Sequence, residues 1–300
     1  MKRVLILINP EKPGARETAA SLCPWVGQRA TVESADLADA PIPTDADLVV
    51  VLGGDGSILK AARMLAGREV PVVGINMGKL GYLAEFSAEA FCQAFDAIVS
   101  GDMPVSRRLM LRARIATAEG ESERLVLNDV LVAGGLAHRM AGVRLAIDGD
   151  PITTYNGDGV LVSTPTGSTA YCMAAGGPLL APGLEAMVLV PICPHSLTHR
   201  PIVLRPDAEV VLEPDDLQVE AVCVCDGQDK VRLAPGDRVT IRRAESAFLL
   251  VQGRRQPFET LSQKLHWGHL PRYQNREGTM GRRDRGTKKH GNKEGGDHHE

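Results

Sequence analysis

The feature of this sequence that most restricts its fold is an alternation of apolar runs and helical patterns in the first hundred residues. Residues 3–8, 47–52 and 70–75 are short and almost continuously apolar, which is typical of strands buried on both faces of a sheet. Helical periodicity follows the second run and returns over residues 88–99. Strands that alternate with helices form a parallel sheet with helices on its faces. We therefore predict an α/β domain with a parallel sheet over residues 1–100.

The sequence changes character after Gly101. From there to about residue 250, short strand-like runs are separated by turn signals and helical periodicity is nearly absent. This pattern predicts a second, all-β domain over residues 101–250. A helical pattern returns at residues 257–267, and beyond it apolar residues nearly vanish. Residues 271–300 are therefore predicted to be a disordered tail.

Composition excludes several classes of partner. Charged residues make up 24% and the formal net charge is -3, so neither nucleic acid nor an anionic membrane is an expected partner. The opening apolar run ends at Asn9-Pro10, and no later stretch is long enough to span a bilayer. A cytoplasmic location follows as the default expectation. The six cysteines lack the spacing of a zinc or redox motif, so reduced thiols and no protein-held metal are predicted.

The sequence GGDGS at Gly53–Ser57 follows a buried strand and precedes a helical pattern. At such a position, glycine backbone and the helix N-terminus can bind a phosphate. Asp55 would repel a polyphosphate unless it takes up a proton or a metal intervenes, and both roles fit phosphoryl transfer. Lys60 can reach back to a phosphate. The alternatives are a plain Gly-Asp-Gly turn and a lysine that faces solvent.

A second candidate segment covers residues 157–175. Asp158 lies in a polar loop before an apolar strand, and the run Thr164–Tyr171 follows that strand. Its hydroxyl groups, small residues and single aromatic ring suit contact with phosphates, ribose hydroxyls and a base. The alternative is a Ser/Thr-rich loop that caps a helix.

Three further positions carry polar groups in unexpected places. Asn128 and Asp129 interrupt an apolar strand, which indicates a cleft, a β-bulge or a strand end. His138 is a lone histidine, and such residues more often pack in the core or lie on the surface than act in catalysis. The segment Asp226–Gln228 ends an apolar run and is typical of a hairpin turn.

Taken together, these segments resemble the NAD kinase family over most of residues 1–270. GGDGS alone is not specific, because 6-phosphofructokinases and diacylglycerol-type lipid kinases share it. TPTGSTAY at the observed distance is highly specific. The segments that agree in order and spacing are GGDGS (53–57), GINMGKLGYLAEF (74–86), ND (128–129), GDGVLVSTPTGSTAY (157–171), PICPHSLTHRPIVL (191–204), DGQ (226–228) and LSQKL (261–265).

The resemblance implies a two-domain fold, in which an α/β N-terminal domain precedes a β-sandwich and residues 251–270 pack back on the first domain. It implies transfer of a phosphoryl group to the 2′-hydroxyl of the adenosine ribose of NAD, with Asp55 as general base. ATP with Mg²⁺, another triphosphate or polyphosphate would be the donor. It also implies a homodimer or homotetramer with the site between the domains.

The resemblance further assigns nucleotide contacts. Tyr171 would lie close to an adenine, and Asp158 would hold a ribose or the nicotinamide end. Many family members carry a basic residue at the position of Asn156, so this chain departs from the pattern there. The implied contact residues are Gly53, Gly54, Gly56, Lys60, Asn128, Asp129, His138, Asn156, Asp158, Thr169, Ala170, Tyr171, Cys172, Met173, Ala174 and Gln228.

Three other functions compete with this reading. A sugar or lipid kinase of the same superfamily gives no reason for TPTGSTAY. A sensor that binds NAD without using ATP gives no reason for Asp55 and the glycine loop. An NAD-dependent oxidoreductase would carry GxGxxG, which is absent.

Overall fold

The computed structural model describes residues 1–38, 42, 45–78, 81–134, 141–215, 221–253, 262 and 264. Residues 1–260 form one compact unit, and the features below lie in it. The predicted tail, and most of the segment 251–270, lie outside the described residues.

The first sheet contains the predicted parallel strands. Its strand order is β2-β1-β3-β4-β18-β5, and every neighbouring pair is parallel except β18 with β5. The central strands β1, β3 and β4 are almost wholly buried, as their continuous apolar sequences predict. The strands are β1 (Arg3–Ile8), β2 (Thr31–Asp36), β3 (Leu48–Gly53), β4 (Val72–Asn76), β5 (Val105–Arg108) and β18 (Phe248–Val251).

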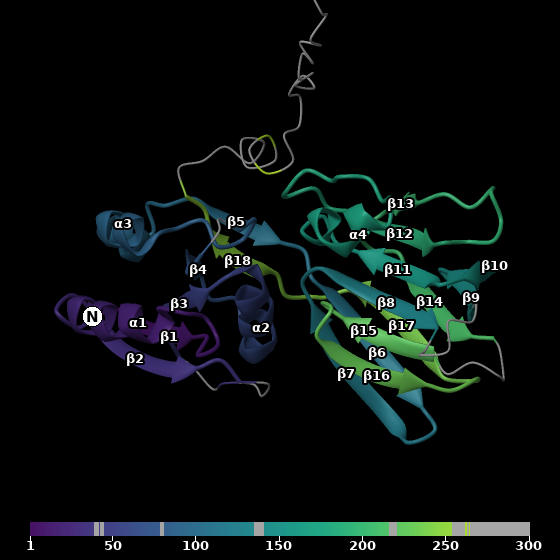
Figure 1. The fold of residues 1–300 in the computed structure, drawn as a ribbon, viewed down its shortest axis with the longest axis horizontal. Coiled ribbons are helices and arrows are strands. Elements are labelled where there is room, and N and C mark those ends of the chain that lie inside the picture. The colour runs from purple at the N-terminus through teal and green to yellow at the C-terminus, as the bar shows by residue number, and fades with distance from the viewer. Residues whose placement is uncertain are drawn as a thin grey trace, which may run out of the picture. The chain divides into compact units, whose positions relative to one another are not determined.

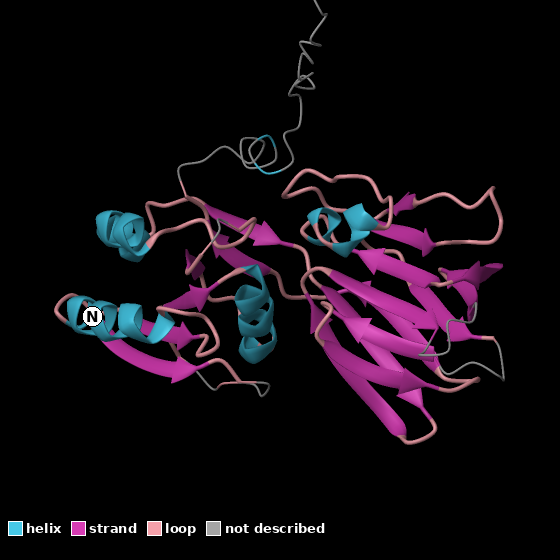
Figure 2. Ribbon diagram, in the orientation of Figure 1, coloured by secondary structure: helices cyan, strands magenta, loops and turns pink. Residues whose placement is uncertain are grey.

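Helices cover both faces of this sheet (Figures 1 and 2). Helices α1 (Ala15–Gly27) and α3 (Ala88–Ser100) pack in one apolar cluster with alternate strand residues such as Ile6 and Val50. Helix α2 (Asp55–Leu65) packs on the other face, against the intervening strand residues. Residues on alternate positions of a strand point to opposite faces, so the strands supply both clusters. The predicted α/β domain is confirmed.

The second part is a sandwich of two antiparallel sheets, with orders β10-β9-β14-β17-β6-β7 and β13-β12-β11-β8-β15-β16. Figure 2 shows these strands in magenta, with little helix among them. The strands are β6 (Leu111–Thr117), β7 (Gly120–Val126), β8 (Asp129–Gly134), β9 (Ala141–Ile147), β10 (Asp150–Gly157), β11 (Gly159–Ser163), β12 (Met187–Ile192), β13 (Ile202–Leu204), β14 (Val210–Pro214), β15 (Ala221–Cys225), β16 (Asp229–Leu233) and β17 (Arg238–Arg243).

One apolar core lies between the two sandwich sheets. Val132 and Val160 of one sheet and Ile115 and Val239 of the other are fully buried in it. Cys223 and Cys225 face this core as free thiols, which confirms that they share one face of a strand. Burial raises the pKa of Cys172, another buried thiol, and keeps it protonated.

Two strands join the halves of this unit, and neither was placed in the first domain by the sequence. β5 and most of β18 fall in the range 101–250 predicted for the second domain, yet both belong to the first sheet. They pair with each other in an antiparallel register from Arg108 with Phe248 to Val105 with Val251. The chain therefore leaves the first sheet and returns to it through adjacent strands.

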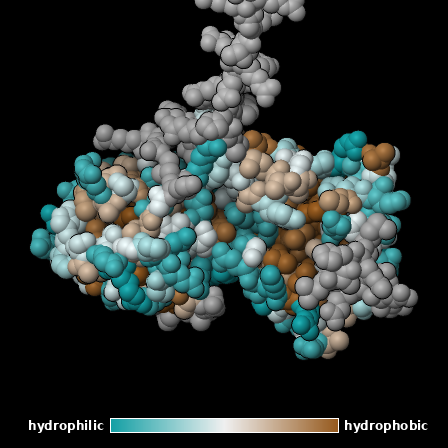
Figure 3. Space-filling view, viewed as in Figure 1, coloured by the Kyte–Doolittle hydropathy of each residue, from teal (hydrophilic) through white to brown (hydrophobic). Residues whose placement is uncertain are grey.

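Among the described residues, no helix is both long enough and apolar enough to cross a bilayer. The face in Figure 3 is a mosaic, in which hydrophilic residues surround separate hydrophobic patches.

Candidate functional site

The glycine loop Gly53–Ser57 is the point where a buried strand turns into a helix. Helix α2 starts at Asp55, inside the glycine loop rather than after it. A Cβ on Gly53 would lie 2.1 Å from Ser57 Oγ, so this position requires glycine. A Cβ on Gly54 would have no atom within 4 Å. The loop thus pairs one tightly packed glycine with an open one, where a phosphate can approach the N-terminus of α2.

A cavity of about 330 Å³ opens over this loop. It brings together several of the predicted residues and two from the end of β1, Asn9 and Lys12, that sequence reasoning missed. The carboxyl ends of neighbouring parallel strands meet at one edge of a sheet, and this signal could have identified them. The lining residues are Asn9, Pro10, Glu11, Lys12, Leu37, Gly54, Asp55, Gly56, Ser57, Lys60 and Gln228.

Asn9 and Ser57 hold the loop in place. The Asn9 amide donates a hydrogen bond to Ser57 Oγ at 2.9 Å, and the Gly54 N–H donates to the same oxygen at 3.2 Å. Ser57 is buried, so these bonds are shielded from water. Exposed Lys12 and half-buried Lys60 add two positive charges to the cavity lining. Two carboxylates, Glu11 and Asp55, also line the cavity, so a bound polyanion would rely on the lysines, the N-terminus of α2 and an accompanying cation.

Asp55 links the glycine loop to residues 81–84. Its carboxylate accepts hydrogen bonds from the backbone N–H groups of Tyr82 at 2.8 Å, Leu83 at 2.9 Å and Ala84 at 3.1 Å. A Cβ on Gly81 would lie 1.9 Å from Asp55 Oδ1, so glycine there makes room for the carboxylate. Burial, and then the Asp55 charge, raise the pKa of the Tyr82 phenol. Asp55 is thus held in one orientation by the GKLGYLAEF segment.

The Asn128–Asp129 pair does not interrupt one continuous strand, as the sequence suggested. Instead β7 ends at Val126 and β8 begins at Asp129, with Asn128 in the connection. The structure corrects the continuous strand to a strand end, which was one of the alternatives. The cause is Asp226, whose carboxylate accepts N–H bonds from Leu127 at 3.1 Å, Asn128 at 2.6 Å and Asp129 at 3.3 Å.

Asp226 is the main residue of this site that sequence reasoning passed over. The predicted hairpin turn is present between β15 and β16. However, the Asp226 side chain is buried, with φ 51°, and faces the connection between β7 and β8 rather than solvent. Its partners lie about a hundred residues away in the sequence, so no local pattern identifies them. The one local signal in the sequence is an acidic residue directly after an apolar strand.

Asp129 and Asp226 form a buried acidic pair. Burial, and then the neighbouring Asp226 charge, raise the pKa of the Asp129 carboxyl to about 7. Burial also raises the pKa of Asp226, although the three backbone N–H groups and then Arg63 oppose that shift. Asn128 Oδ1 is buried and has no hydrogen-bond partner among the described residues. These groups offer an unmet acceptor and a poised acid at one place.

Two hydroxyl groups of the Thr164–Tyr171 run, those of Thr164 and Ser168, bond to backbone within the protein. Thr164 Oγ1 donates to Leu127 O at 2.6 Å and accepts from the Gly167 N–H at 3.0 Å. Ser168 Oγ donates to Pro165 O at 2.7 Å. These buried hydroxyls therefore fix the loop itself, and the residues after Thr166 remain the candidates for contact with a ligand.

Those residues form a 3₁₀ turn, Gly167–Thr169, and the short helix α4, Tyr171–Ala174. Tyr171 is 47% exposed, so its ring is accessible to a ligand. Thr169, Ala170 and Met173 are half-buried and Ala174 is exposed. Cys172 is fully buried against Leu161 and Val190, so it can offer a ligand only its backbone.

The other predicted residues are spread around the sandwich. Asn156 at the end of β10 and Asp158 before β11 are both exposed. Gln228 reaches the glycine loop, where its side-chain amide donates to Gly56 O at 3.2 Å. His138 lies outside the described residues.

Comparison with known proteins covers both halves of the chain. The ATP-NAD kinase N-terminal domain family matches residues 28–103, and the ATP-NAD kinase C-terminal domain family matches residues 127–253. An NAD kinase of Geobacter metallireducens is 38% identical over 89% of this chain and 99% of its own length. An NAD kinase of Heliobacterium modesticaldum is 38% identical over 89% of this chain and 100% of its own.

Solved structures agree with these relatives. Yeast NADH kinase, solved with NADH, superposes with a TM-score of 0.83 at 23% identity, covering 91% of this chain and 89% of its own, which shows a shared fold. An NAD kinase of Archaeoglobus fulgidus, solved with ATP, gives a TM-score of 0.72 at 27% identity over 88% of this chain and 98% of its own. With the two family matches and the near-complete coverage of its relatives, the chain belongs to the NAD kinase family.

Proposed function

We propose that this chain transfers the γ-phosphoryl group of ATP to the 2′-hydroxyl of the adenosine ribose of NAD, giving NADP and ADP. Membership of the NAD kinase family supports this reaction. The observation that carries it here is the cavity over the glycine loop, which two lysines and a helix N-terminus make suitable for a triphosphate.

The proposed acceptor side is built from the sandwich. Asn128 Oδ1 lacks a partner among the described residues, so it can accept a hydrogen bond from a ribose hydroxyl or a base amine. The exposed ring of Tyr171 offers a stacking surface to adenine. The further contacts that the family resemblance implies are proposed for Asp129, His138, Asn156, Asp158, Thr169, Ala170, Cys172, Met173, Ala174 and Gln228.

Asp55 is the proposed general base. Its carboxylate has about four lone-pair sites and accepts three backbone N–H bonds, which leaves one site for the ribose hydroxyl. In the reaction the 2′-oxygen bonds to the γ-phosphorus, the bond from that phosphorus to the bridging oxygen breaks, and Asp55 takes the hydroxyl proton. Because the N–H groups fix the carboxylate, little reorganisation is needed when substrate binds.

Mg²⁺ would enter with the nucleotide and offset the charge of the triphosphate. Among the described residues, no three His, Cys, Asp or Glu side chains are grouped as a metal site. The cavity lining offers two carboxylates, Glu11 and Asp55. This set fits an ion that takes most of its ligands from phosphate and water. As the family resemblance implies, we also propose a homodimer or homotetramer and a cytoplasmic location.

The test is conversion of NAD to NADP with MgATP, by purified wild-type protein and by the Asp55→Asn variant. We expect turnover by the wild type and a loss of about 10²–10⁴-fold in kcat for Asp55→Asn, with NAD affinity largely retained. NADP formation from polyphosphate but not ATP would change only the donor. A wild type that binds NAD but forms no NADP with any donor would favour a sensor, and a fully active Asp55→Asn would remove the base assignment.

A further inference from the structure

The inference concerns Arg63, which lies on helix α2 two turns after the glycine loop. Residues 56 and 63 are seven positions apart, so they lie on the same face of the helix. Arg63 Nη2 donates to Gln228 Oε1 at 2.6 Å, and Gln228 Nε2 donates to Gly56 O at 3.2 Å. One glutamine of the β15–β16 hairpin therefore bridges two points on α2, the first of them in the glycine loop itself. We call this arrangement the Arg63–Gln228–Gly56 clasp.

The same hairpin holds the acceptor side. Asp226, two residues before Gln228, accepts the N–H groups of Leu127, Asn128 and Asp129. The Asp226 N–H in turn donates to Asp129 O at 2.9 Å. Hydrogen bonds therefore join the hairpin to the glycine loop through Gln228 and to Asn128 and Asp129 through Asp226. Within the hairpin the two sets are connected by the backbone of Gly227.

Charge gives a second reason for the position of Arg63. Its Nη1 atom is buried and has no hydrogen-bond partner among the described residues, so part of this cation is removed from water. A desolvated charge is costly unless an opposite charge lies near it. The Arg63 charge acts on Asp226, whose carboxylate is nearly fully buried beside Asp129. Arg63 therefore places a positive charge near Asp226 that favours the ionised form of that carboxyl.

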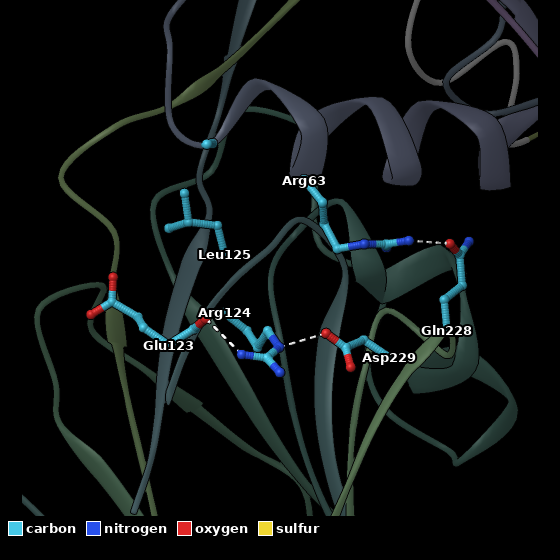
Figure 4. Close-up of a pocket in the computed structure, with 7 residues that line it drawn as sticks. Arg63, Glu123, Arg124, Leu125, Gln228 and Asp229 are labelled. Carbon is cyan, nitrogen blue, oxygen red and sulfur yellow. Dashed lines mark hydrogen bonds and ion pairs between the residues drawn. The ribbon is translucent and has the colours of Figure 1, made fainter. Parts of the chain in front are cut away.

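A second arginine, Arg124, lines the same cavity as Arg63 but has a different partner, so the two can be compared. The cavity, of about 650 Å³, is lined by Arg63, Ala66, Glu123, Arg124, Leu125, Gln228 and Asp229. In Figure 4, Arg63 points along α2 to Gln228, whereas Arg124 points from β7 to Asp229. Arg124 Nε donates to Asp229 Oδ2 at 2.5 Å. Both arginines bind the same hairpin, but only Arg63 connects it to the glycine loop.

We propose that Arg63 is a positioning residue, which acts through Gln228 to fix the glycine loop relative to the Asn128–Asp129 turn. This inference depends on the proposed function only where its test measures enzyme kinetics. Positioning requires that the loss of Arg63 slow the transfer step more than it weakens either substrate, because a misplacement of about 1 Å can cost about 10²-fold in rate. A merely structural arginine would lower stability and leave kcat unchanged.

The test uses the full chain with Arg63→Met, Arg63→Lys, Gln228→Ala and the double variant Arg63→Met/Gln228→Ala, and with Arg124→Met as the matched control. We expect Arg63→Met to lose about 10–100-fold in kcat, with less than about threefold change in NAD affinity and in the KM for ATP. Arg63→Lys keeps the charge and should recover part of the loss. The double variant should lose no more kcat than Arg63→Met alone, since both substitutions break one clasp, whereas loss of the contact proposed between Gln228 and the dinucleotide should raise only the KM for NAD. Arg124→Met should keep its kcat.

A second measurement needs no turnover. Hydrogen exchange of the ligand-free protein should become faster in residues 53–60 and 221–233 of Arg63→Met, whereas Arg124→Met should leave residues 53–60 unchanged. A normal kcat in Arg63→Met, or unchanged exchange in residues 53–60, overturns the proposal. A wild type without NADP formation would sink the proposed function instead, and the exchange data would still decide whether the clasp holds the loop.

Discussion

The two sides of the candidate site differ in where their polar groups are satisfied. On the side of the first sheet, the glycine loop keeps an open position at Gly54 and two lysines at the cavity, so its polar surface faces outward. On the side of the sandwich, Thr164, Ser168 and Asp226 are buried and hydrogen-bonded to backbone. The first side is built for access, and the second is built as a rigid frame.

This difference teaches where substitutions should act on rate and where they should act on stability. An open loop can lose a functional group without losing its fold, because water replaces the missing contact. A buried polar frame cannot, because each broken bond leaves an unsatisfied group away from water. The following substitutions test that division, starting with the largest expected effect.

Gly81→Ala tests the access side. The new Cβ would occupy the position of Asp55 Oδ1 and displace the carboxylate from its three N–H donors. We expect about 10²-fold lower kcat and a smaller fall in Tm than Gly167→Ala gives, because the atom in the way is the end of a side chain rather than backbone. Steady-state kinetics and thermal unfolding measure both. A large fall in Tm with normal kcat would show that Gly81 supports the fold rather than the position of Asp55.

Gly167→Ala tests the frame side. Its Cβ would lie 2.2 Å from the backbone oxygen of Asn128, and backbone cannot move aside as a side chain does. We expect a loss of about 2–3 kcal/mol in the free energy of unfolding and about tenfold weaker NAD binding. Chemical denaturation and calorimetric titration check the two values. Gly54→Ala, which has open space for its Cβ, is the control for stability and should unfold like the wild type.

Asp129→Asn tests the frame side through the pH dependence of its stability. The pKa of Asp129 is raised from 3.8 to about 7, so the folded state binds the proton more tightly than the unfolded state. Its contribution to stability is therefore full below pH 3.8 and is lost as pH rises to about 7. At pH 8 we expect the variant to be about 1–3 kcal/mol more stable than the wild type, yet to bind NAD roughly fivefold more weakly.

Denaturation of both proteins across pH 4–8 measures this difference. The gain in stability should vanish toward pH 4. Asp150→Asn, on an exposed carboxylate of β10, is the control and should show no gain that depends on pH. Equal stability of wild type and Asp129→Asn at pH 8 would contradict a buried, costly carboxylate in the frame.

Ser57→Ala should have the smallest effect. It removes the oxygen that bonds the Asn9 amide and the Gly54 N–H. We expect a loss of about 1 kcal/mol in stability and a rise of about threefold in the KM for ATP. Asn9→Ala should give the same rise, since it breaks the same contact from the other end. Different kinetic effects of the two variants would show that Asn9 acts independently of Ser57.

The sequence predicts the access side better than the frame, and the reason is physical. Strand β3, the glycine loop and helix α2 are consecutive, so burial, turn and helix all leave local signals. The Asp226 bonds to Asn128 and the Thr164 bond to Leu127 join residues 98 and 37 positions apart. Such contacts depend on which strands become neighbours, and no local pattern encodes that.

The same reason explains the misplaced strands. β5 and β18 are short, and each lies next to sandwich strands in the sequence. Their membership of the first sheet follows from the pairing of β18 with β4 and of β5 with β18, over separations of about 180 and 140 residues. For Asn128 and Asp129, the sequence correctly indicated that polar groups in an apolar run need partners. It could not indicate that the partner is a hairpin turn in another part of the sandwich.

The pairing of β5 with β18 also defines how the two halves can move. A single peptide linker swivels about every backbone dihedral angle, whereas two hydrogen-bonded strands must bend together. Residues 109–247 leave the first sheet after Arg108 and re-enter it at Phe248, its register partner. The connection between the halves is therefore a pair of hydrogen-bonded strands. Such a pair resists twisting and bends most easily out of its own plane.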